Sequence, residues 1–364
     1  KRGEAKIVAA TKRAAQSEVL LPTEAGFLEA EGLEYTDRFT QRQIASAADT
    51  QTAAKAYNMT LDQLGPYRIA FAADGRRVLL GGRKGHVAVM QWEGCRILHE
   101  MHLGETVRDL TFLRDHTMFA VAQHKNLYIY DGKGVELHCL RTHRPQVNRL
   151  GYLRYHWLLG TVGPSGVLRY LDVSTGENVA ERASKLGECD CLRVNPWNAL
   201  VHLGHANGMV SLWTPNLHEP VAKMLCHKGA VSALAIDRGG RHMVTAGRDG
   251  VVKVWDVRTY RSLHSYRTPR PASAVDISDR GLLAVAHGPA VQVFADGLAR
   301  RASRAYVAHK LPGCAAEAVR ARPPERAPRC AHAPPSLPQP HVSATRAQVR
   351  FCPYEDVLGV GHSR

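Results

Sequence analysis

The sequence predicts an all-β fold, a seven-bladed WD-repeat β-propeller with a helical or extended amino-terminal arm. Two observations predict it. One complete four-strand repeat ends in Trp255-Asp256, 28 residues after His227, and the last strand of that repeat recurs along the chain at a nearly constant period. Periods of about 40–45 residues are typical of four-stranded propeller blades.

The complete repeat shows its strands directly. Apolar residues alternate along 231–236 and 252–255, and the pairs Gly239-Gly240 and Asp249-Gly250 are typical of hairpin turns. Four polar side chains of this repeat can form one hydrogen-bonded tetrad, from the Trp255 indole through the Thr245 hydroxyl and His227 to Asp249. Such a tetrad satisfies polar groups that would otherwise be buried unpaired, so we assign it a structural role.

The other blades follow from the period. Alignment on the last residue of each repeat gives steps of 40, 41, 42, 42 and 39 residues, between Gln91, Asp131, Asp172, Thr214, Asp256 and Ala295. We therefore expect blades one to six in residues 65–310 and the start of a seventh blade in residues 347–364. The seventh blade could be completed by the amino-terminal arm or by chain beyond Arg364, and the sequence leaves both open.

Two segments do not follow the blade pattern. Residues 1–64 have the composition of a docking arm, with helical stretches over Glu4–Leu20 and Ser46–Tyr57. This arm either orders against a partner or the propeller wall or remains a free tail. Residues 311–346 are rich in Pro and Ala, and we expect a low-complexity, disordered insertion there.

Composition limits the function classes. No run of 18 apolar residues occurs, so no membrane-spanning helix is expected. The chain begins with Lys1 and has no apolar signal region, which suggests a trimmed fragment of a longer protein. The eight cysteines include no Cys-x-x-Cys pair, so we expect a reducing compartment and neither a disulfide framework nor a zinc site.

The charge suggests a polyanionic partner. The net charge is +15, and residues 297–350 alone carry 10 Lys and Arg against 2 Asp and Glu. RNA is the commonest large polyanion, although a solvated basic surface explains the same numbers. The candidate phosphate contacts are the basic residues Lys1, Arg2, Lys12, Arg13, Arg83 and Lys84. Arg83 and Lys84 lie in a glycine-rich stretch that lacks the P-loop order, so it predicts a hairpin turn.

Nothing in the sequence supports catalysis. There is no Gly-x-Ser-x-Gly elbow and no cysteine nucleophile signature. The histidine pairs His99/His102, His138/His143 and His202/His205 lie on or beside strands without a carboxylate at metal spacing, so core or surface histidines are favoured over metal ligands. We therefore expect a non-enzyme without cofactor, metal or small-molecule substrate.

Several longer motifs resemble one WD-repeat family, the nucleolar WD-repeat subunit of the small-subunit processome, which processes the precursor of small-subunit ribosomal RNA. These motifs are residues 21–22, 26–32, 64–67, 81–86, 105–109, 120–123, 135–140, 203–208 and 351–362. The resemblance implies a nucleolar scaffold that docks other processome proteins, pre-ribosomal RNA and small nucleolar RNA.

The chain departs from the repeat pattern at three blade ends. Gln91, Thr214 and Ala295 replace the usual Asp, so those blades lack one polar anchor. The alternative function is a WD-repeat peptide reader or ubiquitin-ligase substrate adaptor, which an aromatic cage on the top face would favour. We identify no clear cage in the sequence.

Overall fold

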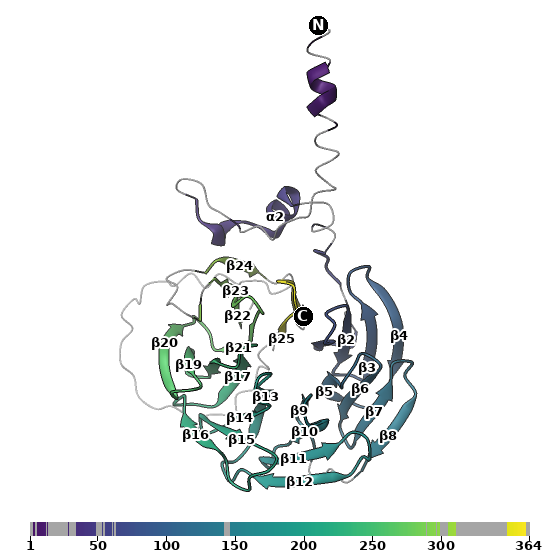
Figure 1. Cartoon of the computed structure of the whole chain (residues 1–364), viewed down its shortest axis with the longest axis vertical. Coiled ribbons are helices and arrows are strands. Elements are labelled where there is room, and N and C mark those ends of the chain that lie inside the picture. Colours follow the sequence, from purple (N-terminus) through teal and green to yellow (C-terminus); the bar gives the residue numbers. More distant parts are fainter. Residues whose placement is uncertain are drawn as a thin grey trace, which may run out of the picture.

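The computed structural model is a ring of antiparallel sheets, so the prediction of an all-β propeller is confirmed (Figure 1). From residue 61 onward the structure describes the chain to residue 361, except for residues 62, 142–145, 289, 296, 299–304 and 311–347. Of the first 60 residues it describes 3, 6–11, 13, 28, 34–48, 53 and 55–59.

Six four-stranded sheets follow one another along the chain, each a simple meander from an innermost to an outermost strand. Blade 1 consists of β1 (Tyr67–Phe71), β2 (Arg77–Gly82), β3 (His86–Gln91) and β4 (Arg96–His102). Blade 2 consists of β5 (Val107–Phe112), β6 (Met118–Gln123), β7 (Leu127–Asp131) and β8 (Glu136–Leu140). Blade 3 consists of β9 (Arg149–Leu153), β10 (Leu158–Val162), β11 (Val167–Asp172) and β12 (Asn178–Ala183). Blade 4 consists of β13 (Cys189–Val194), β14 (Val201–His205), β15 (Met209–Trp213) and β16 (Ala222–Leu225). Blade 5 consists of β17 (Val231–Ile236), β18 (His242–Gly247), β19 (Val251–Asp256) and β20 (Arg261–Arg267). Blade 6 consists of β21 (Ala272–Ile277), β22 (Leu283–His287), β23 (Ala290–Phe294) and β24 (Val307–Lys310).

The seventh sheet has two strands among the described residues. Strands β25 (Gln348–Phe351) and β26 (Leu358–Gly361) pair with each other and lie between blades 6 and 1. The described residues therefore form six four-stranded blades rather than the seven that we predicted. Residues 348–361 supply the two strands of this sheet, and residues 311–347 and 362–364 on either side lie outside the described residues. The insertion predicted at 311–346 lies outside the described residues.

The core is divided among seven interfaces between neighbouring sheets. Leu79 of blade 1 and Phe119 of blade 2, for example, are fully buried against each other's sheets. The two-stranded sheet forms two of these interfaces: Cys352, which follows β25, packs in the cluster of Ile69 in blade 1, and Val349 packs in the cluster of blade 6. Each strand alternates its side chains between the two faces, so both faces of every sheet bury apolar residues. The two-stranded sheet therefore closes the ring.

Polar contacts hold both sides of this closure. The Phe351 amide donates to Asp276 Oδ2 at 2.7 Å on the blade 6 side, and the Ile69 amide donates to Gln348 Oε1 at 3.1 Å on the blade 1 side. Gly75 has a φ of +71° and lies against the backbone of Pro353. A Cβ atom at residue 75 would lie 2.7 Å from the Pro353 carbonyl oxygen. The seam thus requires a glycine at residue 75.

The amino-terminal arm contains short helical pieces. Residues 6–11 are helical, the 3-10 turn η1 spans Thr36–Arg38, and α2 spans Gln41–Ala47. Within the helix that we predicted over Ser46–Tyr57, residues 46, 47 and 53 are helical and residues 56 and 57 are not, while residues 49–52 and 54 lie outside the described residues. The Thr40 amide donates to Gln43 Oε1 at 2.8 Å, and this capping contact starts α2 earlier than the Ala-rich composition suggested.

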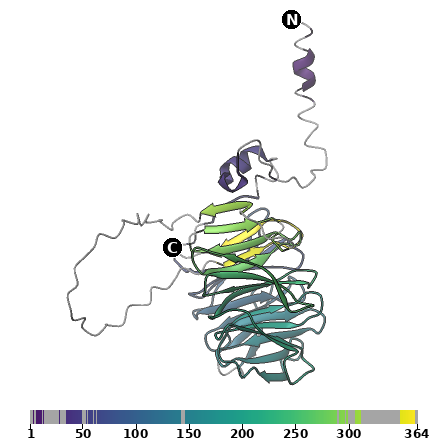
Figure 2. The same ribbon diagram turned by 90° about the vertical axis from the view of Figure 1, so that its left-hand side faces the viewer.

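The arm contacts the ring at the seam. The Leu28 amide donates to Tyr306 Oη at 2.6 Å next to β24, and Lys55 Nζ lies 2.9 Å from Glu355 Oε2 between β25 and β26. At the blade 1 end, Lys84 Nζ donates to the Gln63 carbonyl at 2.9 Å. In both views α2 lies outside the ring, beyond β24 (Figures 1 and 2). The arm therefore crosses from blade 6 to blade 1 over the incomplete sheet.

Candidate functional site

The four residues of the predicted tetrad lie together inside blade 5. Trp255 Nε1 donates to Thr245 Oγ1 at 3.0 Å, and Thr245 Oγ1 lies 2.8 Å from His227 Nε2. His227 Nδ1 lies 3.1 Å from Asp249 Oδ2. Thr245 and Trp255 are on the adjacent strands β18 and β19, while His227 and Asp249 are in the loops at one end of the blade. The tetrad thus ties two loops to two strands.

The electrostatics of the tetrad favour a neutral histidine. Burial lowers the pKa of His227, and the hydrogen bond and charge of Asp249 only partly oppose this. Burial raises the pKa of Asp249, but the Val251 amide and His227 more than compensate, so the pKa is lower than usual. His227 is 2% exposed, so a substrate has no access to its ring. The arrangement suits a structural hydrogen-bond network.

A second network, which the sequence reasoning missed, lies in blade 4. His205 Nε2 lies 2.7 Å from Ser211 Oγ, and Trp213 Nε1 donates to the same hydroxyl at 2.9 Å. Burial lowers the pKa of His205 to about 4, so this ring is neutral at pH 7. The order histidine, hydroxyl and tryptophan matches the inner part of the blade 5 tetrad. The sequence signal for this network was Ser211, which lies two residues before Trp213. The blade ends in Thr214 rather than in the usual Asp.

Charged side chains gather where the innermost strands meet. A cavity of about 230 Å³ is lined by residues of β1, β5, β21 and β25 together with Leu150 of β9. The charged residues on the innermost strands around it are Arg68, Arg149, Arg193, Arg350, Asp109 and Asp276. Four of these six side chains are arginines and two are aspartates.

The two aspartates act as hubs of this cluster. Asp109 accepts from Arg68 at 2.8 Å and from the Leu150 amide at 2.9 Å, so it links three blades. Burial raises its pKa, but Arg68, Arg149 and the Leu150 amide more than compensate, so the carboxyl is ionised. Burial and Arg350 together lower the pKa of Arg193 to about 10.

Two guanidinium nitrogens remain unsatisfied in this cluster. The Nε atoms of Arg193 and Arg350 are buried, and neither has a hydrogen-bond partner among the described residues. Buried donors are normally paired with protein or solvent acceptors.

The structure describes three of the six residues that we predicted to contact phosphate. Arg83 and Lys84 are exposed in the turn between β2 and β3, and the charge of Arg83 contributes to the lowered pKa of Arg108, of which burial is the larger cause. Arg108, at the start of the neighbouring strand β5, also donates to Asn148 Oδ1 at 2.8 Å and to Gln146 Oε1. Arg13 is exposed on the amino-terminal helical piece. The other three candidates, Lys1, Arg2 and Lys12, lie outside the described residues.

Two further expectations concern compartment and membrane. The described cysteines Cys95, Cys139, Cys189, Cys191, Cys226 and Cys352 are thiols rather than disulfides. In the part of the chain that the structure describes, no helix has the length and apolar character needed to cross a membrane.

Comparison with known proteins identifies relatives. The WD domain, G-beta repeat model matches residues 218–256, which contain the blade 5 tetrad. Over 96% of its length the chain is 41% identical to WD repeat-containing protein 46 of Homo sapiens, and over 97% it is 41% identical to U3 small nucleolar RNA-associated protein 7 of Saccharomyces cerevisiae. Identity to WD repeat-containing protein 46 of Caenorhabditis elegans is 37% over 96% of the chain.

The chain spans 53% of the human relative, 61% of the yeast relative and 55% of the nematode relative. The similarity extends from the amino-terminal arm through all the blades, far beyond the single repeat that the WD model matches. A shared fold alone does not produce identity of this level over 350 residues, because unrelated WD repeats share only their structural positions. The chain therefore belongs to the family of WD-repeat proteins that includes WD repeat-containing protein 46 and U3 small nucleolar RNA-associated protein 7.

Proposed function

We propose that this chain is a non-enzymatic scaffold of the small-subunit processome in the nucleolus, needed for the processing and folding of the small-subunit ribosomal RNA precursor. The observation that carries the proposal is the 41% identity, across nearly the whole chain, to a protein associated with U3 small nucleolar RNA. The proposed partners are other processome proteins, pre-ribosomal RNA and small nucleolar RNA, with no membrane, small-molecule substrate or cofactor.

The geometry supports a scaffold rather than an enzyme. The histidine networks of blades 4 and 5 are buried, and their rings are neutral and tied to structural hydroxyls. A general base must reach the proton that it abstracts, and these rings face blade interiors. The relatives give no support to the alternative, a peptide reader or ubiquitin-ligase substrate adaptor.

We assign the RNA contacts to the basic turn of blade 1. Arg83 is exposed and Arg108 lies close enough for their charges to interact, which suits a phosphate between them. Lys84 is partly engaged by the Gln63 carbonyl and contributes charge at a fixed position. Contacts of this kind bind the RNA backbone and depend on salt rather than on sequence.

We further propose that β25 and β26 are the inner half of a seventh blade, and that the arm of residues 1–64 is a docking element separate from blades one to six in residues 65–310. The sheet has the position of a blade, with interfaces to blades 6 and 1. The arm carries exposed apolar side chains, including Ile7 and Val8 at 66% exposure, which suit burial against a partner.

The test of the scaffold role is assembly. A tagged copy of the whole protein that contains this chain is expected to sediment with a large nucleolar particle, and its depletion is expected to raise unprocessed small-subunit RNA precursor. Sedimentation only in a small complex, with normal precursor levels after depletion, would refute the proposal and favour the ligase adaptor.

The test of the RNA contact uses the purified chain. The double variant Arg83→Gln and Arg108→Gln is expected to weaken binding of structured RNA and to lower the slope of log affinity against log salt by about 1 to 2. The matched control is Arg96→Gln, because Arg96 is exposed at the opposite end of the same blade. An equal effect of both changes would place the RNA elsewhere.

A further inference from the structure

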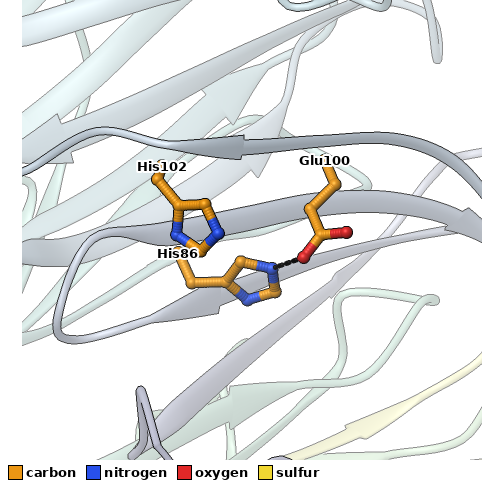
Figure 3. A group of neighbouring side chains, drawn as sticks. All are labelled: His86, Glu100 and His102. Atoms are coloured by element: carbon orange, nitrogen blue, oxygen red, sulfur yellow. Dashed lines mark hydrogen bonds and ion pairs between the residues drawn. The ribbon is translucent and has the colours of Figure 1, made fainter.

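Two histidines and one glutamate converge on one face of blade 1. Strands β3 and β4 pair so that His86 lies directly opposite His102 and Ala88 opposite Glu100. Residues two apart on a strand point to the same face, so Glu100 and His102 both flank His86. Figure 3 shows the three side chains together, with the His86–Glu100 contact dashed. One potential ligand atom from each residue lies within 4.8 Å of the other two.

We propose that His86, Glu100 and His102 bind a divalent transition-metal ion of the zinc class. Two imidazole nitrogens and one carboxylate oxygen are the donor set of zinc sites that keep a fourth position for water or an incoming ligand. Magnesium and calcium prefer oxygen donors alone, so the imidazoles select against them. One carboxylate gives the site a single negative charge, which the dication more than neutralises.

The distances suit such an ion after a small adjustment. Bonds of about 2.0–2.1 Å in a tetrahedron put neighbouring ligand atoms about 3.3 Å apart. His86 Nε2 and Glu100 Oε1 are already 2.9 Å apart, and the rings of His86 and His102 have centroids 5.2 Å apart. The three ligand atoms lie within 4.8 Å of one another, and His102 and Glu100 are exposed on the outermost strand, so their side chains can move closer to His86 without disturbing the core.

The surroundings of His86 hold its ring in place for this role. His86 is 5% exposed, and its Nδ1 lies 3.2 Å from Tyr67 Oη. Metal-binding histidines commonly donate their second ring N–H to a polar group, which fixes the tautomer and the ring orientation. When Nδ1–H donates to the Tyr67 oxygen, the lone pair of Nε2 points toward Glu100. Tyr67 is thus the positioning residue of the site.

A histidine–glutamate pair without metal is the competing explanation of these contacts. In that case His86 Nε2–H donates to Glu100, and Tyr67 donates to Nδ1. This arrangement gives no role to His102, whose ring lies next to His86 but forms no hydrogen bond among the described residues. The proposed metal accounts for the position of the His102 imidazole next to that of His86. The ion would also add positive charge three residues from Arg83, beside the basic turn.

The experiment uses the whole purified chain after removal of any affinity tag and of bound metal with a chelator. Zinc alone is added, binding is measured by calorimetry, and retained metal is measured by mass spectrometry after dialysis. We expect one zinc ion per chain and, with cobalt as a probe, visible ligand-field absorption of a tetrahedral site. The same titration at lower pH should show weaker binding, because protons compete for imidazole nitrogens.

The variants test the exposed ligands, because loss of the buried His86 could disturb folding. His102→Ala and Glu100→Gln are each expected to lower zinc affinity by about 100-fold or more, and Tyr67→Phe by about 10-fold or more. His218→Ala is the control, because His218 is exposed in another blade. Absence of stoichiometric zinc in the parent chain, or unchanged affinity in His102→Ala, would overturn the proposal. Zinc lost only on cysteine alkylation would assign the metal to thiols and overturn it equally.

Discussion

Acid should destabilise this propeller through histidines that are buried in the neutral form. His202 in β14 is fully buried, its Nδ1 lies 3.3 Å from Met243 Sδ, and its Nε2 has no hydrogen-bond partner among the described residues. Burial lowers the pKa of His202 to about 3, and burial lowers the pKa of His205 to about 4. Both rings are therefore mainly neutral in the folded chain at pH 5 and above.

The sign and size of the effect follow from linkage. In the unfolded chain these histidines titrate near their ordinary pKa of about 6.5. Protons thus bind the unfolded state more readily below that pH, so stability is complete above about 6.5 and is lost as the pH falls toward the folded-state values. Between pH 7 and pH 5 the loss is about 2 kcal/mol for each of the two histidines, or about 4 kcal/mol together.

The assay is denaturant unfolding of the chain, followed by tryptophan fluorescence and circular dichroism at pH 7 and pH 5. The His202→Leu variant should lose about 2 kcal/mol less than the parent chain over this interval, because one of the titrating groups is gone. The exposed His218→Gln variant is the control and should lose as much as the parent. An equal loss in His202→Leu and the parent would show that His202 is not buried neutral, and would refute the reasoning.

Three further changes test the tetrad, the seam and the arm. Asp249→Ala should lower the free energy of unfolding by about 1–3 kcal/mol, since His227 loses its partner at 3.1 Å, and an unchanged denaturant midpoint would contradict a structural tetrad. Gly75→Ala should cost about 2 kcal/mol or more, because φ is +71° and the new Cβ meets the Pro353 oxygen; Gly281→Ala, with positive φ and no nearby atom, separates the backbone cost from the clash. Deletion of residues 1–60 should leave a cooperatively melting propeller that enters the processome poorly, and loss of folding would instead show that the arm helps to close the ring.

The sequence predicted the blades because their order is local. Each blade is a meander of four consecutive strands, so alternation and turn residues identify it without knowledge of its neighbours. The tetrad residues lie within one such unit, which is why their positions could be proposed from spacing. Composition alone did not locate the start of α2 in the arm, which begins at Gln41 after the Thr40 cap rather than at Ser46.

The charged centre could not be predicted from any single blade. Asp109 is 41 residues from both Arg68 and Leu150, and only closure of the ring brings these residues into hydrogen-bonding distance. The repeat period contained the signal, because residues about 40 apart occupy matching positions on the innermost strands. The same alignment that located the blade ends would have found the cluster if it had been applied to charged residues.

The histidine–glutamate cluster was missed for a different reason. We paired His99 with His102, but residues three apart on a strand point to opposite faces, so these two cannot share a ligand. The residue that shares a face with His102 is Glu100, and its partner across the strand pair is His86. A search by strand register would have identified all three residues.

The buried and accessible polar groups of this ring differ in what they can do. The buried networks around Thr245 and Ser211 join a neutral histidine to a tryptophan, so they stabilise single blades and offer a partner no charge. The exposed Arg83 carries positive charge in the turn of blade 1, and arginines surround the buried Asp109 at the centre of the ring. This division suits the proposed scaffold, because rigid blades would hold the charges of the basic turn in fixed positions.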